Sequence, residues 1–431
     1  MRTSTALRLL ALGLGWFASG AFAQADNAAA FLDARPAPLK PYFAKLYDEG
    51  ERNAVLNLQT LAVVAMQQRE YTIAERALDE ALLRIDAVAI QDANAERARS
   101  TFSEEKVKDF KGEPYERSMA FYYRGLLYLR TGDFQNARAA FLNAGMQIAF
   151  SRNEKYKGDF GLMNLLASWC SQCDGDAIRA KELREAALSE DATLASAPAL
   201  GSVLVLVEAG QGPRKAGEGK HKEMLVFQEA DNGLDVLESV KMVDGETRER
   251  PIADFSPFKA GDVQYQAMNR GGRPIQGILD GKVEFKDTAS AVGSVASEVG
   301  KQALSMGLST GNNRLGNFGL AGMFVGLIAD AAASAAKPAA DTRAWLNLPR
   351  EIYIASADPA NLSGSVAAVV ARPAQPNTGT RVLANAKGCT LLWGRTRSAT
   401  LDASQLAVDP YVDGGRAESD KRFRLLLAER F

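Results

Sequence analysis

The stretch AFYYRGLLYLRTGDFQNARAAFLNAG, residues 120–145, decides the fold of the first half of the chain. A turn-like Thr131-Gly132-Asp133 divides it into two segments. In each segment apolar and small residues recur at helical spacing: Phe121, Gly125 and Tyr128 before the turn, then Ala137, Phe141 and Ala144 after it. Paired stripes of this kind predict an antiparallel helical hairpin, in which small residues let the two helices approach closely.

Similar patterns lie upstream and, in weaker form, downstream. The upstream stripes are Leu58, Leu61, Ala62 and Ala65, then Ala74, Leu78 and Ala81; the downstream hairpin has Ala167, Ser168 and Ser171, then Ala180, Leu183 and Ala187. The spacing from Gly125 to Ala144 is that of the tetratricopeptide signature, although the equivalent Ala74, Ala137 and Ala180 lie 63 and 43 residues apart instead of about 34. We therefore expect residues 24–195 to form a tetratricopeptide-like helical domain with insertions. A generic helical bundle is the alternative.

The chain begins with the features of a secretory signal peptide. Arg2 and Arg8 precede a short apolar run, Leu9 to Phe17, and Ala21-Phe22-Ala23 supplies a cleavage site. The two arginines are not adjacent, so the signal peptide is not of the twin-arginine type. No cysteine precedes Cys170, so no lipobox follows the signal peptide. Residues 1–23 are therefore predicted to direct export, which indicates a periplasmic protein, with association to the outer membrane left open.

Composition excludes several classes of function. A formal net charge of −1 lacks the basic excess of a nucleic-acid-binding protein. His221 is the single histidine, it lies near no recognisable nucleophile motif, and zinc sites with several histidines are impossible. A Cys₃His site from Cys170, Cys173, His221 and Cys389 would need ligands from three distant segments. We expect no metal site and no cofactor.

The second half, residues 196–431, is predicted to be β-rich, which makes the whole chain α+β. Strand-like runs are 202–207, 224–227, 239–243, 275–279, 282–286, 351–355, 366–371, 390–393 and 423–427, and Asp280-Gly281 marks a hairpin.

A helical insertion is expected at about residues 287–340, where 13 Ala, 8 Gly and 6 Ser make up half of the positions. Its most apolar part, 318–329, is too short to span a membrane and stops at Asp330. Gly322 and Gly326 have the spacing of close helix contacts, so we predict two helices packed within the C-terminal half. Peripheral contact with a membrane is the alternative.

Cys170 and Cys173 form a Trp-Cys-x-x-Cys motif typical of thioredoxin-like enzymes. Here the preceding residues look helical, which would put the thiols at a helix C-terminus, where the helix dipole raises a thiol pKa. A local disulfide between Cys170 and Cys173, or two packed thiols, is the plainer interpretation. Cys389 is expected to pack in a strand beside Leu391 and Trp393.

A basic, glycine-rich stretch, residues 210–222, is the predicted partner-binding site. It carries Arg214, Lys215, Lys220 and Lys222, but it is not a P-loop, because Gly217 is followed by Glu218. The stretch is either a solvated loop between two strands or a contact for an anion: a lipid head group, a wall polymer or an acidic protein.

Three phrases of sequence carry a family resemblance: GEPYER at 112–117, EAGQGPRK at 208–215 and DTRAWLNLP at 341–349. Together they resemble an uncharacterised family of bacterial envelope proteins with N-terminal tetratricopeptide-like helices. Members are often lipoproteins, whereas this chain lacks the lipobox. The resemblance implies export, architecture and an envelope role, and no active site.

These observations favour a non-enzymatic scaffold of the cell envelope that binds a protein partner through its helical hairpins. The alternative is a periplasmic thiol-disulfide protein that uses Cys170 and Cys173.

Overall fold

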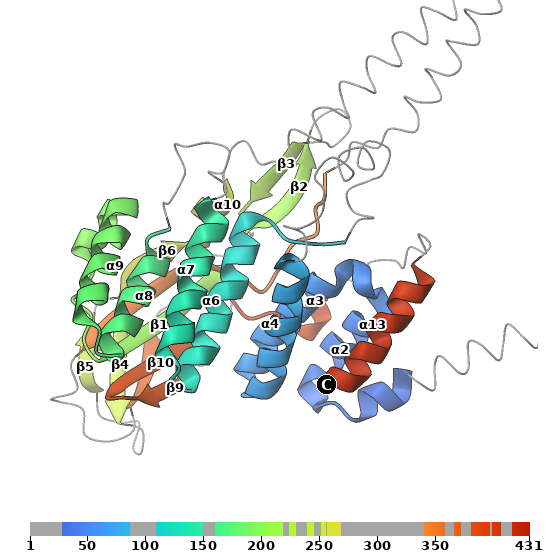
Figure 1. Ribbon diagram of the computed structural model, residues 1–431, viewed down its shortest axis with the longest axis horizontal. Coiled ribbons are helices and arrows are strands. Elements are labelled where there is room, and N and C mark those ends of the chain that lie inside the picture. The colour runs from blue at the N-terminus through green and yellow to red at the C-terminus, as the bar shows by residue number, and fades with distance from the viewer. Residues whose placement is uncertain are drawn as a thin grey trace, which may run out of the picture. The chain divides into compact units, whose positions relative to one another are not determined.

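A computed structural model describes residues 28–86, 109–149, 160–218, 224–229, 239–244, 251–255, 257–268, 340–357, 366–371, 381–396, 399–406 and 416–431. The chain divides into two compact units (Figure 1). The first combines the residues up to Leu82 with Leu401–Phe431, and the second is Leu83–Thr400. The boundary predicted at residue 195 therefore falls inside the second unit. The signal peptide predicted at residues 1–23, the hairpin predicted at 275–286 and nearly all of the helical insertion predicted at about 287–340 lie outside the described residues.

Three helical hairpins have the same turn. They are α3 (Ala54–Gln67) with α4 (Tyr71–Asp86), α6 (Pro114–Arg130) with α7 (Phe134–Ala149), and α8 (Leu162–Cys173) with α9 (Ala177–Glu190). Each turn has one residue with positive φ: Arg69 at 65°, Gly132 at 74° and Gly175 at 85°. In each, the next N–H donates to the carbonyl five residues back: Glu70 to Ala65 at 2.8 Å, Asp133 to Tyr128 at 3.0 Å and Asp176 to Ser171 at 2.9 Å. These are Schellman motifs, and they confirm the hairpins predicted on either side of residues 67–70, 131–133 and 174–176.

The equivalence of Ala74, Ala137 and Ala180 is also confirmed. The N–H of each alanine donates at 3.0 Å to the carbonyl of the residue that follows the positive-φ position. All three alanine side chains are buried. The three hairpins are thus repeats of one local structure at irregular sequence intervals.

The first unit is closed by the last helix, α13 (Ala417–Arg430), which packs beside the joint between α2 (Lys40–Glu49) and η2 (Glu51–Asn53). Asp420 Oδ1 accepts a hydrogen bond from the Glu51 N–H at 2.8 Å, and Arg424 Nε donates to the Tyr47 carbonyl at 3.1 Å. The carboxylate thus meets the start of one helix and the guanidinium the end of another, as the helix dipoles favour.

The strand predicted at 423–427 is therefore wrong. Phe423 and Leu427 lie one helical turn apart on α13 and are both buried. The strand-like run at 423–427 is only five residues long, and a run of this length fits either a helix or a strand.

A mixed five-stranded sheet forms the second layer of the second unit, in the order β6-β7-β1-β10-β9. The strands are β1 (Val203–Gln211), β6 (Phe258–Asp262), β7 (Pro349–Ala357), β9 (Arg381–Ala386) and β10 (Cys389–Arg395). β1 and β10 are parallel, and the other pairings are antiparallel. The short helix α10 (Val263–Met268) follows β6.

Two smaller sheets complete the described strands. β2 (Arg214–Glu218) pairs with β3 (Met224–Gln228), and β4 (Ser239–Asp244) lies between β5 (Pro251–Phe255) and β8 (Val366–Ala371). The strands predicted at 202–207, 224–227, 239–243, 351–355, 366–371 and 390–393 are confirmed. The chain is thus α+β, with paired helices followed by a mixed sheet.

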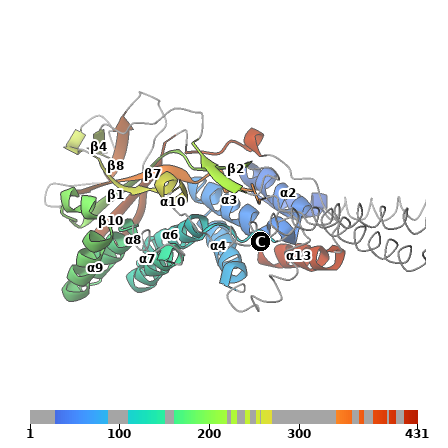
Figure 2. The same ribbon diagram turned by 90° about the horizontal axis from the view of Figure 1, so that it is seen from above.

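Helices α6 to α9 cover one face of the five-stranded sheet (Figure 2). Trp169 Nε1 of α8 donates to the Gly201 carbonyl at 2.9 Å, just before β1. The largest fully buried side chains of this unit include Trp169, Trp345 and Trp393. Within the part of the chain that the structure describes, no helix is both long and apolar enough to cross a membrane.

Candidate functional site

The basic stretch predicted to bind a partner is divided in the structure. Arg214 is exposed at the start of β2, where its Nη2 donates to Gln211 Oε1 at 3.2 Å. The Lys215 side chain is only 2% exposed, because its Nζ pairs with Glu116 at 2.6 Å. Lys220 and Lys222 lie outside the described residues, as does His221. Lys215 is therefore part of the interior and is not offered to a partner.

The partner of Lys215 is positioned by the start of α6. Pro114 stands in the first turn, where the missing N–H costs nothing, and Glu116 follows two residues later. Glu116 Oε2 accepts from the Glu113 N–H at 2.7 Å and from Lys215 Nζ, and Oε1 accepts from the Trp345 N–H at 2.9 Å. The Glu116 side chain is fully buried. Two backbone N–H groups and the Lys215 ammonium thus replace the water that an ionised carboxylate requires.

Asp341 and Arg343 continue the same group of charges. Arg343 Nη2 donates to Asp341 Oδ2 at 2.6 Å, and the Arg343 N–H donates to Asp341 Oδ1 at 3.0 Å. Burial acts to raise the pKa of Asp341, but the hydrogen bonds and charge of Arg343, together with the charge of Lys215, outweigh it and hold this pKa below its ordinary value.

Arg117 fixes the outer side of the group. Its Nη1 donates to the Gly112 carbonyl at 2.8 Å and its Nε donates to Gln147 Oε1 on α7 at 2.9 Å. Burial lowers the pKa of Arg117, and the carboxylates of Glu113 and Glu116 partly offset this effect.

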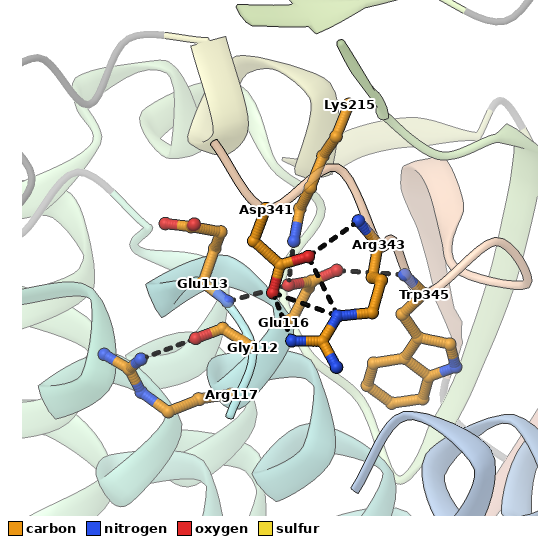
Figure 3. Close-up of polar contacts among 8 residues, drawn as sticks. All are labelled: Gly112, Glu113, Glu116, Arg117, Lys215, Asp341, Arg343 and Trp345. Atoms are coloured by element: carbon orange, nitrogen blue, oxygen red, sulfur yellow. Dashed lines mark hydrogen bonds and ion pairs between the residues drawn. The ribbon is translucent and has the colours of Figure 1, made fainter. Parts of the chain in front are cut away.

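We call these residues the Glu116 cluster: Gly112, Glu113, Glu116, Arg117, Lys215, Asp341, Arg343 and Trp345 (Figure 3). They come from the three phrases of sequence at 112–117, 208–215 and 341–349. The cluster contains three carboxylates and three cations, so its formal charges cancel. The Glu116 and Asp341 carboxylates accept hydrogen bonds from other members of the cluster, which makes it a connection between the helical layer and the residues leading into β7.

A second buried network, which the sequence did not reveal, joins α6 to the sheet two helical turns further on. Glu208 Oε2 accepts from Tyr123 Oη at 2.7 Å and pairs with Arg395 Nη1 at 3.2 Å, while Glu208 Oε1 accepts from Trp393 Nε1 at 2.8 Å. Arg395 Nη2 donates to the carbonyls of Asn347 and Ala399. The side chains of Glu208 and Arg395 are at most 2% exposed. We call Tyr123, Glu208, Trp393 and Arg395 the Glu208 cluster.

One signal could have found the Glu208 cluster. A single acidic residue follows the apolar run Val203 to Val207, and a single arginine ends the apolar run of β10. Glu208 and Arg395 are direct partners in the parallel pairing of β1 with β10. Burial raises the pKa of Tyr123 well above its ordinary value, with Glu208 acting in the same direction, so this phenol stays protonated and donates.

The cysteines pair differently from the prediction. Cys173 is bonded to Cys389, with 5.9 Å between their Cα atoms, and Cys170 is a buried free thiol. Cys170 and Cys173 do lie at the C-terminal end of α8, as expected. Residues three apart in a helix have Cβ atoms about 5–6 Å apart, farther than the ~3.8 Å of a disulfide, so the pairing crosses to β10 instead. Burial raises the pKa of the Cys170 thiol.

No group of three or more metal-ligating side chains occurs among the described residues. Comparison of the chain with models of protein families, with curated proteins and with solved structures found no match.

Proposed function

We propose that this protein is a non-enzymatic scaffold of the bacterial cell envelope, which holds a protein partner on its tetratricopeptide-like helical hairpins. The observation that carries the proposal is the repeated hairpin: three helix pairs have the same Schellman turn, and stacked helix pairs provide extended binding surfaces in repeat proteins.

The position of the sheet limits where such a partner can bind. Tyr123, Trp169 and Cys173 of α6 and α8 contact the sheet or the residue preceding it, so that side of the helical layer is occupied. Helices α7 and α9 carry large apolar side chains that are exposed: Met146 at 54% and Ile178 at 77%. We infer that the partner contacts these two helices.

Export is part of the same proposal. The predicted signal peptide at residues 1–23 would carry the chain out of the cytoplasm, and a disulfide is the kind of bond that persists in an oxidising compartment. The proposal includes the envelope role that the family resemblance implies, and its alternatives for location are peripheral contact with a membrane and association with the outer membrane. The bond between Cys173 and Cys389 does not favour the alternative of a thiol-disulfide protein using Cys170 and Cys173.

The test is a cross-linking pull-down from envelope extracts with tagged protein. We expect a reproducible partner with the wild-type protein and its loss with the double variant Met146→Asp/Ile178→Asp. Leu425→Asp is the matched control, because Leu425 is 63% exposed on α13 in the other unit. Failure to recover a reproducible partner, or its retention by the double variant, would contradict the proposal.

A further inference from the structure

Three turns of the second unit meet at one end of the helical layer. They are the α6–α7 turn at Gly132, the α8–α9 turn at Asp174, and the β9–β10 turn at Lys387 and Gly388. A Cβ atom added to Gly132 would lie 2.8 Å from the Ala386 Cβ, so the first and third turns touch. The Lys387 ammonium lies 5.6 Å from the centre of the Phe134 ring at the start of α7.

Two links of different chemistry join α8 to the β9–β10 turn at this place. One is the disulfide between Cys173, the last residue of α8, and Cys389, the first residue of β10. The other is the ion pair of Asp174 with Lys387, in which Nζ donates to Oδ1 at 2.5 Å. Cys173 and Asp174 are adjacent, and Lys387 and Cys389 are two residues apart, so the two links act on the same contact.

The β9–β10 turn has two consecutive residues with positive φ, one of which is not a glycine. Lys387 has φ of +50° and Gly388 has φ of +80°. Gly388 adopts this conformation readily, whereas a lysine in the left-handed region is strained and persists only where its surroundings impose it. The ion pair acts on the strained residue itself, and the disulfide acts two residues later.

The two links respond to different conditions. A disulfide is insensitive to salt and is broken by two-electron reduction. The ion pair is partly solvated, with the Lys387 side chain 55% exposed and that of Asp174 13% exposed, so dissolved ions screen it. Salt can weaken the contact only when the covalent link is broken.

We propose that Cys173–Cys389 and Asp174–Lys387 form a two-part clamp, in which the redox state of the disulfide decides whether the contact between α8 and the β9–β10 turn responds to ionic strength. A dithiol reductant supplies two electrons and two protons to the Cys173–Cys389 bond. This yields two protein thiols, while the reductant becomes a disulfide. Among the described contacts, the ion pair is then the remaining link between the end of α8 and the β9–β10 turn, and salt weakens it.

The experiment is amide hydrogen exchange of the full chain, oxidised and after reduction with dithiothreitol, at low salt and in 1 M NaCl. In the reduced protein we expect salt to speed exchange at residues 384–390 by up to about fivefold, which corresponds to the ~1 kcal/mol of an exposed ion pair. In the oxidised protein salt should leave these rates unchanged. Amides of β1 serve as an internal reference for global unfolding.

Two variants separate the clamp from a general salt effect. Lys387→Met should abolish the salt response of the reduced protein, whereas Lys181→Met, which removes the exposed Lys181–Glu185 pair on α9, should preserve it. The proposal is overturned if salt acts equally on the oxidised and reduced proteins. It is also overturned if salt has no effect after reduction, if Lys387→Met still responds, or if β1 exchanges as fast as the turn.

Discussion

Glu116 Oε1 accepts a hydrogen bond from the Trp345 N–H at 2.9 Å, although the two residues are 229 positions apart in the sequence. The same carboxylate accepts from Lys215, 99 positions away. One side chain on the first turn of α6 thus fixes both β2 and the segment that leads into β7.

Removing one charge of the Glu116–Lys215 ion pair should destabilise the protein strongly, whereas removing both charges should destabilise it much less. Glu116→Gln leaves the Lys215 ammonium buried without its counter-charge, and we expect it to lower the free energy of unfolding by about 3–5 kcal/mol. The double variant Glu116→Gln/Lys215→Met should recover most of that loss. Urea unfolding followed by circular dichroism measures both. Glu185→Gln on the exposed face of α9 is the control, and equal losses in the single and double variants would contradict a charge-pairing role.

The lowered pKa of Asp341 predicts that the stability of the folded protein depends on pH. Its folded-state pKa lies below the ordinary value of 3.8, so its ionised form stabilises the folded protein. That contribution is fully present above the unfolded-state pKa and is lost as pH falls through the folded-state pKa. The difference in unfolding free energy between wild type and Asp341→Asn should therefore be large at pH 7 and shrink below pH 3.8. A difference that is the same at pH 7 and at pH 3 would contradict this assignment.

Gly125 and Gly145 provide a matched pair on the two helices of the central hairpin. A Cβ atom on Gly125 would lie 2.6 Å from Cε1 of Phe141, as the predicted close approach of these residues requires, whereas one on Gly145 would lie 3.8 Å from Met163 Cβ. Gly125→Ala should therefore destabilise the protein by ~1–3 kcal/mol through overpacking. Gly145→Ala should raise stability by up to ~1 kcal/mol, the gain in helix propensity. Thermal unfolding gives both values, and a neutral Gly125→Ala would contradict the close packing of α6 on α7.

The disulfide should contribute strongly to stability because it closes a loop of 216 residues. In the chain-entropy description, its removal by Cys173→Ser/Cys389→Ser should cost about 5 kcal/mol. Under native, non-reducing conditions we expect no thiol to react with iodoacetamide, since Cys170 is buried and burial raises its pKa. In denaturant one thiol should react, and three after reduction. Mass spectrometry counts the modified cysteines, and native labelling of Cys170 would contradict its burial.

The helical hairpins and most strands were predictable because their signals are local. Gly132 and Gly175 mark turns within a few residues of the helices that they join, and the apolar run of β1 is continuous. The helix α13 was missed because Phe423 and Leu427 satisfy both a helical spacing and a short strand-like run.

The two charged clusters were not predictable in the same way. Lys215 belongs to a stretch whose glycines and lysines indicate a solvated loop, and only the fold brings Glu116 against it. The disulfide pairing was not predictable for the same reason. Cys170 is the nearest cysteine to Cys173 in sequence, but the direction of side chains on α8 and the position of β10 decide the partner.

The contacts of α13 also make the first unit discontinuous in the sequence. Its Asp420 and Arg424 satisfy backbone groups at the α2–η2 joint, 369 and 377 residues earlier in the chain. A chain that ends before residue 417 lacks these hydrogen-bond partners and cannot complete the first unit. The described strands of the second unit, in contrast, all precede Leu401.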